Sequence, residues 1–382
     1  MNLKRMLRPS SSVLAAGALV ASAIAAAPAH AETRGYVVSW FATATYSQDF
    51  KNNCPQNKNG GRYGNSVKAL MTIGYTEEEA VKIMATQDAL LGPEYMKKIE
   101  SRARVNGKPA SIYNYPEAVA DPMIELSSGK YAFGFDLGSK NNDAKFEDPE
   151  THLKVDNQLW RAVGCVESFK AVAPDIPYFE DLTWHLMIDS APAWAFQVTG
   201  DDLSKDGKVT VTFDKTVQHL MRDASGNVMT NATYVIDPSP RSHNVFQGEI
   251  KDGELRINSG NLYLEGELPY YTEISLANTH MRIKQESDGK LLGYWGGYTD
   301  WKKFVYMYTA RGGINGEDVV GMYHALKKLA DYNPDPKSGQ NQMISTAYRM
   351  EATTVYLATT DGKIIAKPGS LPAPAAEKVA DK

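Results

Sequence analysis

Cysteine is scarce in this sequence. Only two cysteines occur among 382 residues, Cys54 and Cys165, and they lack the Cys-x-x-Cys spacing of zinc sites and of haem attachment. In an oxidising compartment an even pair of cysteines most simply forms a disulfide. We therefore predict a Cys54–Cys165 disulfide. The alternative is a reactive thiol, as in Cys-dependent hydrolases, which needs a histidine within reach.

Short motifs of metal-dependent and nucleotide-dependent enzymes are missing as well. Six of the seven histidines follow residue 31, and no two of them form a His-x-x-x-His or His-x-His pair. Gly-x-Ser-x-Gly is absent, as are a Walker-type phosphate loop and a dinucleotide fingerprint after a strand. These absences argue against a histidine metal cluster, an α/β-hydrolase nucleophile and nucleotide cofactors. The one metal ion that the sequence suggests is calcium.

An excess of positive charge is also lacking. The chain has 41 Lys and Arg against 45 Asp and Glu, and Lys4, Arg5 and Arg8 lie in the first 31 residues. The other 351 residues therefore carry 38 basic and 45 acidic side chains, a net charge of −7. Nucleic-acid binding normally requires a basic face, so it is disfavoured. No basic cluster or long apolar run follows residue 31, so we expect no membrane insertion. Protein partners are not indicated.

The N-terminal stretch has the pattern of an export signal. Three basic residues precede an apolar run from Val13 to Ala27, and Ala29-His30-Ala31 is a small-x-small cleavage site. The run is too short to span a bilayer core of ~30 Å. We predict a signal peptide over residues 1–31 and a periplasmic or secreted mature protein.

Residues 32–178 are predicted to form a mixed helical and loop region that opens with a strand-like run. One helix begins with a capping box, in which Thr76 and Glu79 have the T-x-x-E spacing. A later helix carries Cys165, and Asp156 is expected to be its N-cap.

Residues 179–366 are predicted to form a β-rich domain. Apolar residues recur at every second position in short segments, and Asp-Gly and Ser-Gly turns separate these segments. One such segment contains Leu182, Trp184, Leu186 and Ile188. A helical insertion is expected at about 316–350, with helices at Glu317–Leu329 and about Met343–Arg349. Residues 367–382 are rich in proline, alanine and charge and are expected to form a disordered tail.

Together these elements predict an α+β fold. We expect an antiparallel β-sandwich or barrel-like β domain, a disulfide-stapled helical N-terminal region and a short C-terminal helical pair.

A change of parity marks the strand predicted around residues 272–284. Its apolar residues move from even to odd positions near Ala277–Thr279, which a regular strand with one buried face does not allow, so we predict a β-bulge there. Bulges re-aim side chains, and three polar residues share one parity at this point: Asn278, His280 and Arg282.

An aromatic and glycine-rich patch follows at residues 294–301. Aromatic platforms with nearby hydrogen-bonding groups suit sugar rings or flat apolar ligands. The residues predicted to bind such a ligand are Tyr294, Trp295, Tyr298, Trp301 and Asn278. The alternative is that the aromatic side chains fill the core of the β domain or its hairpin turn.

Candidate acid–base residues occur in the same region: His280, Arg282, Asp300, Glu265 and Glu267. The two glutamates lie two positions apart on one strand, which places them ~7 Å apart on one face, compatible with paired-acid glycoside hydrolysis. The alternative for this pair is a solvated strand face.

A candidate calcium loop begins at Asp331. Oxygen-bearing side chains recur at alternate positions, Asp331, Asn333 and Asp335, as a calcium ion requires. Two departures weaken the pattern: Pro336 replaces the usual glycine, and Gln342 stands where a bidentate glutamate is usual. The alternative is an Asn-Pro-Asp-Pro turn.

Two function classes remain open from the sequence. The first is an exported binding or accessory protein for a saccharide or other small organic ligand held by the aromatic patch. The second is an extracytoplasmic hydrolase or lyase that uses carboxylate and histidine acid–base residues. Missing nucleophile and metal motifs favour the first, although carboxylate-based sites have no short sequence pattern.

Overall fold

The computed structural model describes residues 31–56, 61–86, 92–139, 145–170, 176–267, 271–309 and 316–372. The predicted signal peptide lies outside these residues apart from Ala31, and so does the predicted tail from residue 373 onward. None of the helices in the described ranges has both the length and the apolar character needed to cross a membrane.

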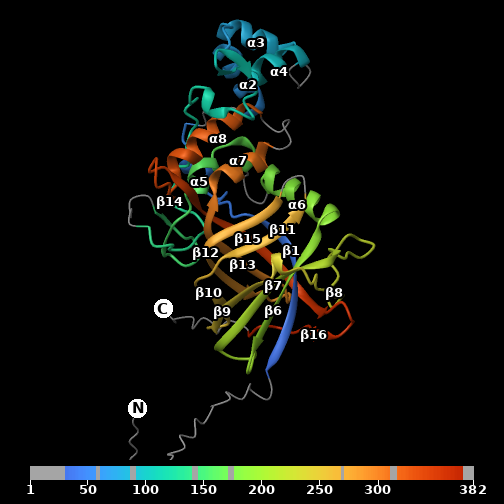
Figure 1. Ribbon diagram of the computed structural model, residues 1–382. Helices are drawn as coiled ribbons and strands as arrows, with labels where there is room; N and C mark the ends of the chain where they lie inside the picture. The colour runs from blue at the N-terminus through green and yellow to red at the C-terminus, as the bar shows by residue number, and fades with distance from the viewer. Residues whose placement is uncertain are drawn as a thin grey trace, which may run out of the picture.

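Eight antiparallel strands form a closed barrel (Figure 1). The order around the ring is β1 (Glu32–Thr43), β6 (Pro192–Gly200), β7 (Gly207–His219), β9 (Asn244–Lys251), β10 (Glu254–Ile257), β12 (Tyr271–Gln285), β13 (Leu291–Asp300) and β15 (Asn341–Ala358). Pairing of β15 with β1 closes the ring, so these eight strands leave no free edge. The predicted antiparallel domain is thus a barrel, and the strand predicted at the start of the N-terminal region is its first strand.

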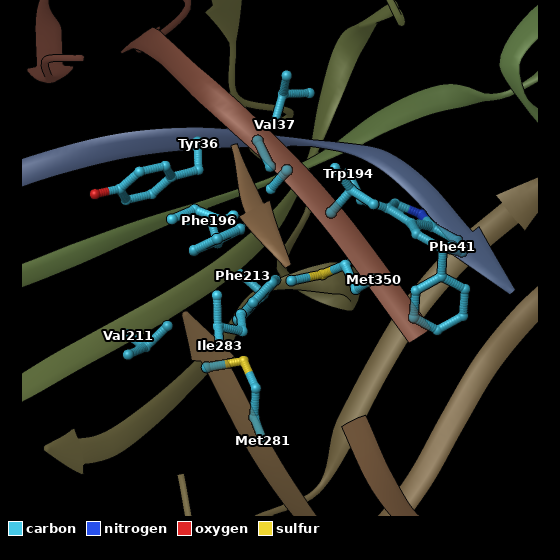
Figure 2. Packing of buried hydrophobic residues seen from close by; sticks show 14 of the residues in the cluster. Tyr36, Val37, Phe41, Trp194, Phe196, Val211, Phe213, Met281, Ile283 and Met350 are labelled. Atoms are coloured by element: carbon cyan, nitrogen blue, oxygen red, sulfur yellow. The ribbon is translucent and has the colours of Figure 1, made fainter. Parts of the chain in front are cut away.

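Large side chains fill the interior of the barrel. Tyr36 stacks on Phe196 with 4.9 Å between ring centroids, and Phe196 stacks on Phe213 at 4.6 Å. Trp295 meets Phe213 edge-on at 4.4 Å, and because β7 and β13 lie opposite each other in the ring, this contact crosses the interior. Figure 2 shows this packing around Phe213 and Met350. Full burial of a large apolar side chain contributes about 1.5–3 kcal/mol, so these rings stabilise the barrel and leave its centre occupied by protein.

Helices are stacked beyond one end of the barrel (Figure 1). The nearer layer contains α5 (Gln158–Val163), α6 (Tyr178–Ser190), α7 (Trp301–Thr309) and α8 (Gly316–Leu329). Its core includes Phe169, Trp301, Phe304 and Met322. The farther layer contains α2 (Gly61–Thr72), α3 (Glu77–Ala85) and α4 (Pro93–Glu100), which pack around Leu70, Ala80 and Ile99.

Two local predictions in the helical region are confirmed. Thr76 and Glu79 form the capping box of α3: the Thr76 hydroxyl accepts the Glu79 N–H, and the Glu79 carboxylate accepts the Thr76 N–H. Cys54, which follows α1 (Phe50–Asn53), is disulfide-bonded to Cys165, which follows α5. Both cysteines are buried.

The remaining elements are short. β2 (Ala103–Val105) pairs with β3 (Lys108–Ala110), and β4 (Phe146–Glu147) pairs with β5 (Lys154–Val155). Around the barrel, β11 (Leu262–Glu267) pairs with β12, whereas β8 (Thr233–Val235), β14 (Tyr332–Pro334) and β16 (Ile364–Ala366) pair with β15. Single 3-10 turns occur at Pro116–Ala118, Glu167–Phe169 and Pro240–Ser242.

Two predicted elements are wrong in type. The segment around residues 182–188 is helix α6, whose buried residues Glu180, Trp184 and Met187 have helical spacing, so its period-two pattern is coincidental. The segment around Met343–Arg349 is part of strand β15, which has a neighbouring strand on each side and buries residues on both faces. The two consecutive helices near the C-terminus are therefore α7 and α8, both before residue 330.

The predicted disordered tail is wrong for residues 367–371. The Lys367 N–H donates to the Thr33 carbonyl, and the Tyr36 hydroxyl donates to the Gly369 carbonyl. Leu371 is 3% exposed and belongs to the main core. Residues 367–371 are therefore held against the barrel.

Candidate functional site

Residues 131–139 and 145–156, here called the covering segment, lie over the outer surface of β12 and β13. The Phe135 ring lies 5.8 Å from the ring of His280. Gly296 leaves the space that Phe135 occupies, since a Cβ atom at Gly296 would lie 2.3 Å from Phe135 Cδ2. The polar positions predicted on β12 therefore face other protein groups.

The predicted bulge in β12 is confirmed. The register with β13 shifts between Ala277 and His280. Asn278 has a φ of 50°, in the left-handed region that asparagine tolerates better than most residues. The bulge restores alternation so that His280 and Arg282 both point outward, toward the covering segment.

Arg282 attaches the covering segment to the barrel. Its Nη2 lies 2.8 Å from Asp148 Oδ2 and 3.4 Å from Glu150 Oε2, and its guanidinium centre lies 4.8 Å from the Tyr294 ring centroid. The Tyr294 hydroxyl donates to Glu150 Oε1 at 2.8 Å. Arg282 is 8% exposed and Asp148 is fully buried. Loss of one partner from such a pair leaves an uncompensated buried charge, which strongly destabilises a fold.

A second group of charges lies beside His280. Lys145 Nζ is 2.6 Å from Asp136 Oδ1 and 3.8 Å from Asp156 Oδ2. Burial lowers the pKa of His280, although the negative charge of Asp136 opposes that shift. Burial also raises the pKa of Asp156. The two shifts have the same physical cause, because burial disfavours the charged form of each group. Lys145 pairs with both carboxylates, so this group of charges is a structural contact within the covering segment.

The N-cap of α5 is Asn157 instead of the predicted Asp156. Asn157 Oδ1 accepts the Trp160 N–H at 2.9 Å. The Asp156 carboxylate instead accepts the Leu137 N–H at 2.9 Å. Asp156 therefore serves the covering segment, and the cap is shifted by one residue.

The four aromatic residues predicted in the 294–301 patch face four different environments. Tyr294 stacks on Phe133 of the covering segment at 4.6 Å, and Tyr298 stacks on Tyr332 at 4.1 Å. Trp295 lies inside the barrel, and Trp301 lies in the helical core, where its indole N–H donates to the Asn341 carbonyl. The four predicted ligand-binding aromatics are each at most 5% exposed: Tyr294, Trp295, Tyr298 and Trp301. A ligand that stacked on any of them would have to displace part of the protein.

The carboxylates predicted for catalysis have structural partners. Asp300 Oδ1 accepts the N–H groups of Lys302 and Lys303 and so caps the start of α7. Glu265 pairs with Lys215 at 2.7 Å and with Arg241 at 3.2 Å. The Glu267 side chain lies outside the part of the chain that the structure describes.

The predicted calcium ligands point to different partners. Asp331 accepts the backbone N–H and the hydroxyl of Ser345 at 2.8 and 2.7 Å. Asp335 accepts the backbone N–H groups of Lys337 and Ser338 within its own turn. Asn333 is exposed, with a φ of 55°. Within the described ranges, no group of three or more His, Cys, Asp or Glu side chains is arranged to hold a metal ion. Calcium at this loop stays a prediction.

A hollow of about 580 Å³ lies where β1 and β15 meet, and we call it the Trp40 hollow. Trp40 of β1 pairs in register with Glu351 of β15, just after a bulge between Val38 and Trp40. The Trp184 ring of α6 lies 5.9 Å from the Trp40 ring and supports it. The hydroxyl and amide side chains that line the hollow are Ser39, Asn227, Thr230, Asn231, Thr353, Thr354 and Ser370.

The charged side chains that line the Trp40 hollow are Asp288, Lys290 and Glu351, and each has a partner of opposite charge. Lys290 Nζ lies 3.6 Å from Asp288 Oδ2, and Glu351 Oε1 lies 2.8 Å from Nη2 of Arg349, which is outside the lining. The hollow thus combines an aromatic ring with many neutral hydrogen-bonding groups and no strong excess of charge. Such a lining suits a neutral, hydroxyl-rich molecule.

Sequence reasoning missed this site because its parts are far apart in the chain. Trp40 belongs to the first strand, the Asp288-Gly289 turn joins β12 to β13, and Thr353 lies near the end of β15. No short motif connects them. The usable signals were a tryptophan in a strand and a polar hairpin turn, and neither indicates the other.

No protein-family model matches this chain, and no curated protein or solved structure matches it significantly.

Proposed function

We propose that this chain is an exported binding protein that holds a neutral, hydroxyl-rich small molecule, such as a saccharide, in the Trp40 hollow. The observation that carries the proposal is one indole ring beside hydroxyl and amide groups around a single hollow, whose charged lining residues all have partners of opposite charge. Its volume, about 580 Å³, lies in the range of roughly 300–1,000 Å³ that is common for small-molecule sites.

The position of the hollow supports this proposal. The barrel interior is filled by rings such as Phe213 and Trp295, so a ligand is better accommodated outside the barrel wall. Trp40 is partly exposed, unlike the four aromatic residues of the 294–301 patch. The binding role predicted from the sequence is therefore kept, with Trp40 as the aromatic contact.

Export is supported by the signal pattern of residues 1–31 and by the disulfide, since disulfides persist in oxidising compartments. Expression of the full chain in a bacterium tests it. We expect the mature protein in the periplasm or medium, beginning at Glu32 and without reactive thiols. A cytoplasmic protein that keeps residues 1–31 would contradict export.

Binding is tested by calorimetric titration of the purified protein with neutral mono- and oligosaccharides. We expect Trp40→Leu to weaken binding at least about tenfold, which corresponds to about 1.4 kcal/mol. Trp40→Phe, which keeps a ring, should weaken it less. Lys290→Ala should also weaken binding, whereas Gln247→Ala, on the exposed face of β9, serves as the matched control.

The outcomes separate the function classes. Saccharide binding that is equal in the wild type and in Trp40→Leu would contradict the Trp40 hollow as the site. Conversion of the bound saccharide to a new product would favour the hydrolase or lyase alternative over a binding protein.

A further inference from the structure

We propose a second ligand site, for a small organic anion that bears a carboxylate or phosphate group, in the farther helical layer. It is a hollow of about 360 Å³ between α4 and the β2–β3 hairpin, and we call it the Lys98 hollow. Its lining consists of Ile73, Gly74, Tyr75, Lys98, Ser101, Arg104 and Pro109. Two of these side chains are cationic and none is acidic.

Lys98 is held in place as a positive charge. Its Nζ donates to the Tyr75 hydroxyl at 3.0 Å and lies over two aromatic rings, 5.7 Å from the Tyr75 centroid and 5.1 Å from the Tyr95 centroid. These contacts restrain an otherwise flexible ammonium group, and cation–π contacts favour its charged form. The Lys98 side chain therefore loses less conformational entropy when an anion binds.

The other polar groups add donors directed at the same space. The Tyr75 hydroxyl accepts from Lys98, which leaves its own hydrogen available to a bound oxyanion. Arg104 Nη1 donates to the carbonyl oxygens of Ser101, Arg102 and Ala103, which fixes its guanidinium group at the hollow. In the described part of the chain, neither Lys98 nor Arg104 forms an ion pair with a carboxylate.

The apolar part of the lining indicates a ligand with a carbon skeleton. Ile73 and Pro109 border the same hollow as Lys98 and Arg104. The volume of about 360 Å³ lies within the range of roughly 300–1,000 Å³ for small-molecule sites. Hydrogen bonds to charged groups are about twice as strong as neutral ones, so Lys98 and Arg104 supply most of the affinity. The site differs from the Trp40 hollow in its position and in the charge of its ligand.

Calorimetric titration of the mature protein with citrate, inorganic phosphate and uncharged glycerol tests the site. We expect citrate to bind, phosphate to bind more weakly because it makes no contact with Ile73, and glycerol not to bind. Lys98→Gln should weaken citrate binding at least about tenfold, and Lys98→Arg should retain most of it. Lys97→Gln is the matched control, because Lys97 is exposed on the same helix and does not line the hollow.

Two results would overturn the proposal: no binding of citrate or phosphate, or citrate binding that Lys98→Gln leaves unchanged. Lys98 is exposed, so its substitution should lower the thermal unfolding temperature only slightly, by the loss of its contacts with Tyr75 and Tyr95. A Lys98→Gln variant that is folded at the assay temperature and does not bind citrate has therefore lost binding and not folding. These results are independent of saccharide binding at Trp40.

Discussion

Replacement of Asp331 by asparagine should make the protein more stable at neutral pH. The Asp331 carboxylate is largely buried and accepts both the N–H and the hydroxyl of Ser345. Burial raises its pKa from 3.8 to about 6, against these hydrogen bonds, because the charged form loses hydration. An asparagine side chain keeps an acceptor oxygen for the Ser345 N–H and removes the buried charge.

The magnitude follows from the pKa. One step in pKa corresponds to about 1.4 kcal/mol, so a rise from 3.8 to about 6 corresponds to about 3 kcal/mol of folding free energy. Residual solvent around the partly exposed side chain reduces this to about 2 kcal/mol. The pKa of Asp331 is higher in the folded state than in the unfolded state. The contribution of Asp331 to the free energy of unfolding is therefore fully present below pH 3.8 and is lost as the pH rises through about 6.

The assay is urea unfolding of the wild type and Asp331→Asn, followed by circular dichroism, at about pH 4 and about pH 7.5. We expect the two proteins to have nearly equal free energies of unfolding at the lower pH and the variant to be more stable at the higher pH. Asp335→Asn is the matched control. Hydrogen bonds from Ser338 and Lys337 lower the pKa of Asp335, so its substitution should reduce stability at both pH values, and this difference should disappear only as the pH falls below 3.8.

An Asp331→Asn variant that is less stable than the wild type at about pH 7.5, or a difference that does not change with pH, would refute this reasoning. The same experiment tests calcium. If Asp331 is a calcium ligand, calcium should raise the wild-type unfolding midpoint, EDTA should lower it, and Asp331→Asn should abolish both effects.

Three further variants have expected effects that unfolding experiments can check. Cys54→Ser with Cys165→Ser opens a bridge between residues 111 positions apart and should cost about 4–5 kcal/mol by the chain-entropy model; a loss below about 1 kcal/mol would contradict that model. Arg282→Met should cost about 3–5 kcal/mol, because it leaves Asp148 buried without its cation; near-wild-type stability would show that the pair is not needed. Asp300→Ala should lower the free energy of unfolding by about 1 kcal/mol because it removes the N-cap of α7, whereas Asp300→Asn should keep a cap. A smaller loss for Asp300→Ala than for Asp300→Asn would argue against capping.

Local rules predicted several features of this fold correctly. The T-x-x-E pattern at Thr76 and the parity change near Ala277 each depend on a few neighbouring residues, and the structure has the capping box and the bulge. Period-two alternation also predicted an antiparallel barrel or sandwich. These features follow from backbone geometry that acts within one turn or one strand, so distant parts of the chain do not change them.

Features that depend on distant segments were not predictable in the same way. The run at Met343–Arg349 resembles a helix because its apolar residues do not alternate. It is a strand because β13 and β1 pair with its two sides and other segments cover its outer face. Conversely, Trp184 and Ile188 alternate like strand residues but form one side of α6. Neither pattern contains information about its eventual neighbours.

The candidate site shows the same limit most clearly. The sequence places His280 and Arg282 on the same parity, and in the structure both point away from the barrel interior. An outward-pointing polar residue on a strand is usually in contact with water. Here Asp148, which lies 134 residues earlier, covers Arg282 as part of another segment. Orientation is a property of the strand itself, whereas accessibility depends on what packs against the strand. Trp40 illustrates the converse, because it is partly exposed and lines a hollow together with a polar turn around Asp288 that its own strand does not encode.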